Sequence, residues 1–243
     1  MPLLPCNNHL NRPLGFSTGC LHKFMDSYSA EAIEQLSLRG QEAIEVICAR
    51  IEEIPRLPAI APLVKMFAIK SVHLPLKICY DNSLEIRTAL KQLEDFYLQV
   101  GATTAVIHPE SVADWSIFDD LQLDLAIENL DDRKPRWFGF EQFEKFFDRY
   151  PDRKMVLDLN HCYTYGDLAE RTERYVSRFG DRITEIHLSG CETNKHHCPL
   201  FKYRQREIVD CLSSTSCPII IESPFDNLSD IDTELQFISD CLK

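Results

Sequence analysis

Eight short apolar runs recur along the chain at intervals of about thirty residues, which is the length of one βα unit. Each run is rich in Val, Ile and Leu, and it lacks the alternation of apolar and polar residues that marks a half-exposed strand. Continuous runs of this kind are typical of parallel strands that are buried on both faces. The runs occupy residues 14–19, 43–47, 71–76, 104–109, 123–129, 154–160, 183–189 and 218–223.

Most of the segments between these runs have the apolar periodicity of amphipathic helices. We expect helices over 29–39, 83–101, 140–150, 167–180, 200–212 and 228–242, and short ones within 48–70 and 109–122. Eight β units that alternate with helices predict one (β/α)₈ TIM barrel over residues 1–243, with 1–13 as an irregular lead-in. A doubly wound open sheet is the alternative, but no GxGxxG follows the first run.

The composition narrows the class of protein. The formal net charge is −12 over 243 residues and no polybasic tract is present, which argues against a nucleic-acid partner without excluding one. The ten cysteines form no CxxC motif, and the first residues do not resemble a secretory signal, so we expect reduced thiols in a cytoplasmic protein. No apolar stretch is long enough to span a membrane.

The apolar runs end repeatedly on ionisable residues. A lone histidine at a strand end is usually structural, and a lone carboxylate there often caps the next helix. In a TIM barrel, however, the C-terminal ends of all strands meet at one mouth, where buried unpaired charges would be costly. A divalent cation removes that cost, and mixed His, Asp and Glu ligands favour Zn²⁺, Mn²⁺, Fe²⁺ or Co²⁺ over Ca²⁺. The predicted ligands are His73, His108, Glu128, Asp158, His161, His187, His197 and Glu222.

The order of these short motifs resembles that of the xylose-isomerase-like TIM barrels. This superfamily includes sugar isomerases, ketose 3-epimerases, sugar-phosphate isomerase/epimerase homologues and endonuclease IV enzymes. The pairing IHLSG…HHCPL and the stretch AIENLDDRKP further resemble a bacterial subgroup of these barrels. The resemblance covers nearly the whole chain and rests on GFSTG, VHLPL with His73, VIHPE with His108, AIEN with Glu128, LDLNH with Asp158 and His161, EIHLS with His187, HCPL with His197, and IIIES with Glu222.

The resemblance implies different sites in two branches. In the epimerase branch it implies one Mn²⁺-type ion, with Glu128 and Glu222 as the catalytic pair that removes and returns a proton; the ligands would be Glu128, Asp158, His187 and Glu222. In the endonuclease IV branch it implies three zinc ions. The first would be held by His73, His108 and Glu128, the second by the same four ligands, and the third by His161, His197 and an acidic residue where this chain has Lys195.

The leading expectation is therefore an isomerase or epimerase that uses one to three divalent ions, Zn²⁺ or Mn²⁺, and acts on a small sugar or sugar phosphate. A di- or trinuclear zinc phosphoesterase is the alternative, and a barrel that binds metal or sugar without catalysis is the third reading. We expect Arg133, Lys134 and Lys195 to contact the substrate, although the first two could instead form a solvated basic turn. Thiolates of Cys162, Cys191 and Cys198 remain open as additional zinc ligands.

Overall fold

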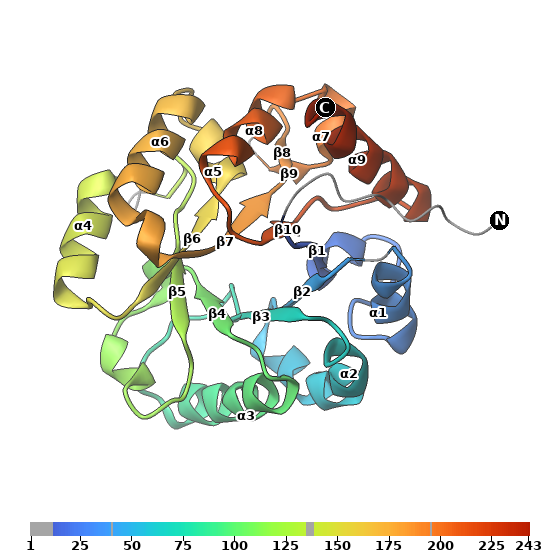
Figure 1. Ribbon diagram of the computed structural model, residues 1–243. Helices are drawn as coiled ribbons and strands as arrows, with labels where there is room; N and C mark the ends of the chain where they lie inside the picture. Colours follow the sequence, from blue (N-terminus) through green and yellow to red (C-terminus); the bar gives the residue numbers. More distant parts are fainter. Residues whose placement is uncertain (1–11, 40, 135–138, 195) are drawn as a thin grey trace.

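Eight parallel strands close into a barrel, in the order β1-β10-β7-β6-β5-β4-β3-β2, so that β1 pairs with both β2 and β10 (Figure 1). This computed structural model describes residues 12–39, 41–134, 139–194 and 196–243; most of the expected lead-in lies outside these residues. The predicted TIM barrel is confirmed, and every predicted run supplies one barrel strand. The strands are β1 Leu14–Ser17, β2 Ala43–Ile47, β3 Ile69–His73, β4 Thr104–Ile107, β5 Leu125–Glu128, β6 Lys154–Asp158, β7 Ile183–Leu188 and β10 Ile219–Ile221.

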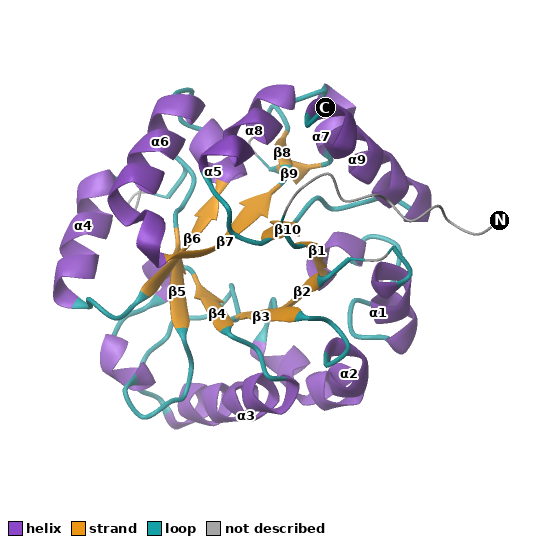
Figure 2. Ribbon diagram, viewed as in Figure 1, coloured by secondary structure: helices purple, strands orange, loops and turns teal. Residues whose placement is uncertain are grey.

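Helices surround the barrel on its outer side (Figure 2). Local sequence sets their ends: the Ser29 hydroxyl accepts a hydrogen bond from the N–H of Ala32 at the start of the first helix, and Gly101 ends the third in the left-handed conformation. The α-helices are α1 Ala30–Ser37, α2 Leu57–Val64, α3 Leu84–Val100, α4 Phe140–Arg149, α5 Leu159–Tyr163, α6 Leu168–Phe179, α7 Leu200–Tyr203, α8 Arg206–Asp210 and α9 Leu228–Cys241. None of the helices in the described residues could cross a membrane.

Short 3₁₀ helices fill several connections: η1 Thr18–Leu21, η2 Ile51–Arg56, η3 Pro109–Ser111, η4 Trp115–Phe118, η5 Gly180–Arg182 and η6 Cys211–Ser214. They account for the segment 109–122, where only a short helix was expected. The single helix expected over 200–212 is wrong. The chain turns at Arg204, which has a φ of 54°, and the Gln205 side chain bonds both the N–H and the C=O of Cys191, each at 2.8 Å. These bonds hold the break between α7 and α8.

The loop after β7 contains an element that periodicity did not predict. Gly190–Cys191 (β8) and His197–Cys198 (β9) form a two-stranded antiparallel sheet. The sheet turns the chain back over the mouth of the barrel, which is how His197 returns to the region of His187.

The barrel interior contains buried carboxylates as well as apolar side chains. Val106, Ala126 and Val156 form a small cluster of their own, separate from the large core between strands and helices. In a packed TIM barrel, inward positions are filled mainly by branched apolar side chains. Here Glu45 and Glu185, both buried, lie in the interior beneath His187. The interior is thus organised around ionisable groups.

Gly15 in β1 is the position where the barrel wall leaves no room for a side chain. A Cβ added there would lie 1.9 Å from the carbonyl oxygen of Ala43 on the neighbouring strand. We expect Gly15→Ala to lower the free energy of unfolding by about 3 kcal/mol, because backbone rather than a flexible side chain must move. Gly180→Ala is the matched control, since nothing lies within 4 Å of its added Cβ and its φ is −50°. Urea denaturation measures both, and equal midpoints would contradict the prediction.

Candidate metal centre

The eight predicted ligands lie together at the C-terminal ends of the strands. The parallel strands carry their C-terminal ends to the same mouth, and Asp158 in β6 pairs directly with His187 in β7. They fall into three groups in which the possible ligand atoms all lie within 4.8 Å of one another. The groups are His73, His108 and Glu128; Glu128, Asp158, His187 and Glu222; and Asp158, His161 and His197. Glu128 and Asp158 each belong to two groups.

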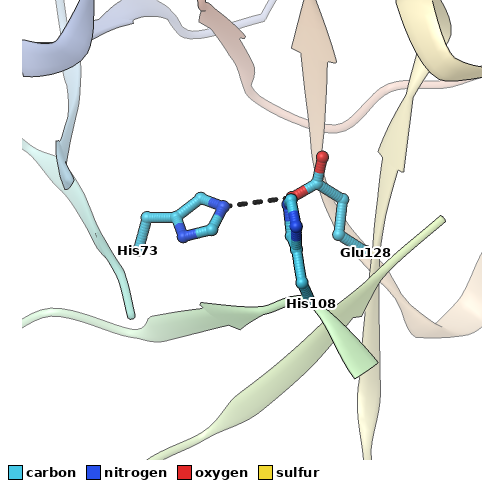
Figure 3. Close-up of side chains that lie close together, drawn as sticks. All are labelled: His73, His108 and Glu128. Atoms are coloured by element: carbon cyan, nitrogen blue, oxygen red, sulfur yellow. Dashed lines mark hydrogen bonds and ion pairs between the residues drawn. The ribbon is translucent and has the colours of Figure 1, made fainter. Parts of the chain in front are cut away.

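The first group joins three consecutive strands. His73 and His108 direct their rings at the carboxylate of Glu128 (Figure 3). Their Nε2 atoms lie 3.1 and 2.9 Å from the same oxygen, Oε2. His73 Nδ1 lies 2.9 Å from the Leu74 carbonyl oxygen, to which it donates its proton. In a neutral ring this leaves a lone pair on Nε2, and a lone pair that faces a carboxylate oxygen calls for a cation between them.

The second group surrounds His187. Its Nδ1 lies 3.3 Å from Glu222 Oε2 and 3.7 Å from Glu128 Oε1. Asp158 contributes Oδ2, which is buried and has no hydrogen-bond partner within the described part of the chain. Both ring nitrogens of His187 are also without hydrogen-bond partners there. Unsatisfied buried polar atoms that converge in this way are typical of an ion-binding site.

The third group depends on a short local motif. Asp158 caps α5, accepting a hydrogen bond at Oδ1 from the N–H of His161 at 2.8 Å, so the Asp-x-x-His spacing places both side chains at the mouth. His161 donates its Nδ1–H to the Asn129 carbonyl at 2.7 Å, which leaves Nε2 unprotonated. That Nε2 lies 3.3 Å from His197 Nε2. Two nitrogen atoms at this distance need a proton or a metal ion between them.

Asn129, which follows Glu128 in AIEN, organises this side of the mouth and was not recognised from the sequence. Its amide accepts from the N–H of Asp158 at 2.7 Å and donates to the carbonyl of Asp158 at 2.9 Å. Because His161 also donates to the Asn129 carbonyl, Asn129 fixes two of the three ligands of the third group, Asp158 and His161. The sequence signal that could have identified Asn129 is an amide side chain directly after a buried strand.

Burial strongly perturbs the ionisation of these groups. Burial raises the pKa of Asp158 to about 7, and it lowers the pKa of His197 to about 4. Burial alone would raise the pKa of Glu222, but the adjacent charge of His187 lowers it to about 2. The site therefore combines buried carboxylates with imidazoles, which is the donor set of Zn²⁺ and Mn²⁺ sites. The buried His, Asp and Glu clusters are compatible with divalent metal ions.

Glu45 and Glu185 lie directly below this centre and were also missed. Glu45 Oε2 and Glu185 Oε1 are 3.2 and 3.5 Å from Nε2 of His187. The signal was a single charged residue inside an otherwise apolar strand, at the centre of AIEVI and two residues before the histidine of EIHLS. Position in the run alone does not tell which residues of a doubly buried strand face the barrel interior.

A cavity of 410 Å³ opens above the ligands. Glu222, His197 and Lys77 are among its lining residues, whereas Arg133 and Lys134 are not. Arg133 forms an ion pair with Asp131, and Lys134 forms one with Glu110 at 2.7 Å. Lys195 lies outside the described residues.

The three candidate thiols belong to none of the donor groups found in the described residues. Cys162, Cys191 and Cys198 are buried. Burial raises the pKa of Cys162 and Cys198, which disfavours the thiolate form that binds zinc. Among the described residues, the candidate ligands are thus imidazole and carboxylate groups.

The sequence matches no protein-family model. It also matches no curated protein. Solved structures do match in fold. The AsfvAP:AG complex, which contains an AP endonuclease, is 15% identical with a TM-score of 0.69, over 96% of this chain and 99% of that one.

Two sugar epimerases match over similar lengths. A 3-keto-D-glucoside 4-epimerase from E. coli is 8% identical with a TM-score of 0.66, over 95% of this chain and 99% of its own. A D-allulose 3-epimerase from Methylomonas sp. is 13% identical with a TM-score of 0.65, over 95% and 98%. At such low identity these matches show a common fold. The chain therefore shares the TIM-barrel fold of these structures, and this is the fold that the resemblance of its motifs to the xylose-isomerase-like barrels predicts.

Proposed function

We propose that this protein is a metal-dependent enzyme that holds two or three divalent cations at the barrel mouth and hydrolyses a phosphate ester. The observation that carries the proposal is the convergence of His73 and His108 on one oxygen of Glu128, at 3.1 and 2.9 Å. A single ion held by the group around His187 leaves these two histidines without a function. Di- and trinuclear sites that bind phosphate oxygens are the setting in which such an additional ligand group is needed.

The surroundings of Glu128 support a ligand role over proton transfer to carbon. Its side chain is 1% exposed, and both oxygens are in contact with imidazoles: Oε2 with His73 and His108, and Oε1 with His161 Nδ1 at 3.3 Å. Although burial opposes the change, the adjacent charge of His108 lowers the pKa of Glu128 well below its ordinary value. A general base needs an accessible oxygen and a pKa near the working pH. A bridging carboxylate needs neither.

The remaining residues have separable roles in this proposal. Divalent cations in the three groups would lower the pKa of water and neutralise the phosphate oxygens. His73 and His161 are buried and hold fixed orientations through bonds to backbone carbonyls. Glu222 and His197 line the cavity, as do His73, His108, Glu128 and His161; the side chains of the first two are 12% and 24% exposed, so a bound substrate could reach them. Lys77, also in the cavity lining, is placed to contact a phosphate.

The cavity and the charge favour a small substrate. A volume of 410 Å³ lies in the range of small-molecule sites. The net charge of −12 opposes association with a polyanion. We therefore infer a small phosphate ester as the substrate class. Cleavage of DNA containing an abasic site is the other outcome that the activity assay must be able to detect.

Sugar isomerisation or epimerisation is the second candidate. Glu128 Oε1 and Glu222 Oε2 lie 3.7 and 3.3 Å from the same atom, His187 Nδ1, so two carboxylates flank one imidazole nitrogen. In that reaction Glu222 would remove a proton from the substrate carbon, and Glu128 would return one to the opposite face. Several structures with this fold are sugar epimerases, some of them solved with D-allulose or D-tagatose bound.

Metal content separates the two candidates. We expect about two to three ions per chain in protein purified without chelators, because each donor group offers enough ligands for an ion. His108→Ala should lower the content by about one ion and leave the other groups loaded. His22→Ala is the matched control, since His22 lines the same cavity but belongs to none of the described donor groups. Elemental analysis by mass spectrometry measures all three proteins. One ion in the parent and in His108→Ala would favour the epimerase.

Activity gives the second test. We expect the Zn²⁺- or Mn²⁺-loaded protein to hydrolyse aryl phosphate mono- or diesters, and Glu222→Gln to lower kcat/KM by about 100-fold or more, because it removes a charged ligand at the cavity. His22→Ala should retain most of the activity. Ketoses incubated with the parent in D₂O provide the opposing measurement. Deuterium on carbon without any ester hydrolysis would favour the epimerase over the hydrolase. If the protein shows neither activity, the remaining interpretation is a barrel that binds metal or sugar without catalysis.

A further inference from the structure

Two buried glutamates lie inside the barrel, one layer below the proposed ligands. Glu45 is in the middle of β2 and Glu185 is in β7, with exposed fractions of 0% and 1%. Neither lines the cavity at the mouth. Ionised carboxylates at such depth are costly unless a partner compensates them. The nearest such partner in the described residues is the ring of His187.

The His187 ring separates two layers of carboxylates. Its Nδ1 faces the mouth, 3.3 Å from Glu222 Oε2. Its Nε2 faces the barrel interior, 3.2 Å from Glu45 Oε2 and 3.5 Å from Glu185 Oε1. If Nδ1 is the metal ligand, a neutral ring must carry its proton on Nε2. That N–H then points at the two glutamates.

These close contacts are not completed hydrogen bonds. Within the described part of the chain, both oxygens of Glu45, Oε1 of Glu185 and both nitrogens of His187 lack hydrogen-bond partners. The three side chains could by their distances also hold a cation of their own. Since His187 can offer a lone pair from only one nitrogen while neutral, an ion in the interior would compete with the one at the mouth. The carboxylates are better suited to accept the Nε2–H.

We propose that Glu45 and Glu185 are positioning residues, which accept the Nε2–H of His187 and so keep its Nδ1 lone pair directed at the metal ion of the mouth. This inference rests on the metal centre of the proposed function. Glu45, at the shorter distance, is the direct acceptor, and Glu185 bounds the ring from its own strand. A carboxylate that accepts the second N–H of a ligating histidine fixes the ring and raises its basicity, and its loss typically weakens metal binding by about 10–100-fold.

The test compares metal affinities in the whole 243-residue chain. Zn²⁺ is titrated in competition with a chromophoric chelator into the parent and into Glu45→Gln/Glu185→Gln, a change that preserves shape and removes charge. We expect the double variant to lose about 10–100-fold in affinity for one ion, while the ion held by His73 and His108 binds as in the parent. Glu94→Gln is the matched control, because Glu94 is equally buried but lies on the outer helix α3. The single variants Glu45→Gln and Glu185→Gln serve if the double variant does not fold.

A second measurement reads the ring itself. Long-range ¹H–¹⁵N spectra of histidine-labelled protein report which nitrogen of His187 carries the proton. We expect Nε2–H in the zinc-loaded parent and a shifted Nε2–H resonance in the double variant. Activity does not enter this readout.

Each outcome decides between the claims. Parental affinity for every ion in the double variant would overturn the positioning role and leave the metal centre intact. Equal weakening at all ions, matched by Glu94→Gln, would mean a general loss of stability and would also overturn it. If the parent binds no ion, the proposed function loses its metal basis, and the spectra alone judge the ring: a proton on Nδ1 overturns the inference, and an Nε2–H that shifts in the double variant supports it.

Discussion

The carboxylate of Glu128 is the interaction on which the rest of the site depends. One oxygen is contacted by His73 and His108, and the other faces His161 and His187. Four imidazoles from four different segments therefore meet at a single side chain that is 1% exposed. If Glu128 were replaced by an apolar residue, the histidines would lose their common partner. The first two donor groups would also lose the carboxylate that they share.

In a barrel, this convergence requires few specific residues, but it lowers the stability of the fold. Parallel strands carry their C-terminal residues to one mouth, so one ionisable residue at the end of a strand is enough to add a ligand. The cost falls on the interior, which holds the carboxylates of Glu45 and Glu185 in addition to the small apolar cluster of Val106, Ala126 and Val156. The large core between strands and helices supplies the hydrophobic stabilisation that the interior lacks. Metal ions bound only to the folded chain would add to it.

The sequence allowed the barrel and the set of candidate ligands to be predicted, because both depend on local features. A strand that is buried on both faces appears in the sequence as a continuous apolar run, and the residue at the end of that run can be identified directly from the sequence. What depends on tertiary contacts was not predictable. The β8–β9 sheet is only four residues, and the break at Arg204 is held by Gln205 through bonds to a distant strand. Glu45 and Glu185 were missed because a run without alternation does not reveal which side chains point inward.

The number of metal ions, rather than the fold, is what separates the possible reactions. The same barrel occurs in sugar epimerases and in an AP endonuclease complex, so the fold does not determine which reaction is catalysed. A third ion by the pattern of endonuclease IV would need an acidic residue at position 195, where this chain has lysine. The carboxylate of Asp158 offers a replacement, since Asp158 belongs both to the group around His187 and to the group with His161 and His197. Sharing Asp158 in this way allows the third group to keep an anionic ligand without one from the loop. The same sharing, repeated at Glu128, links all three groups into one continuous centre.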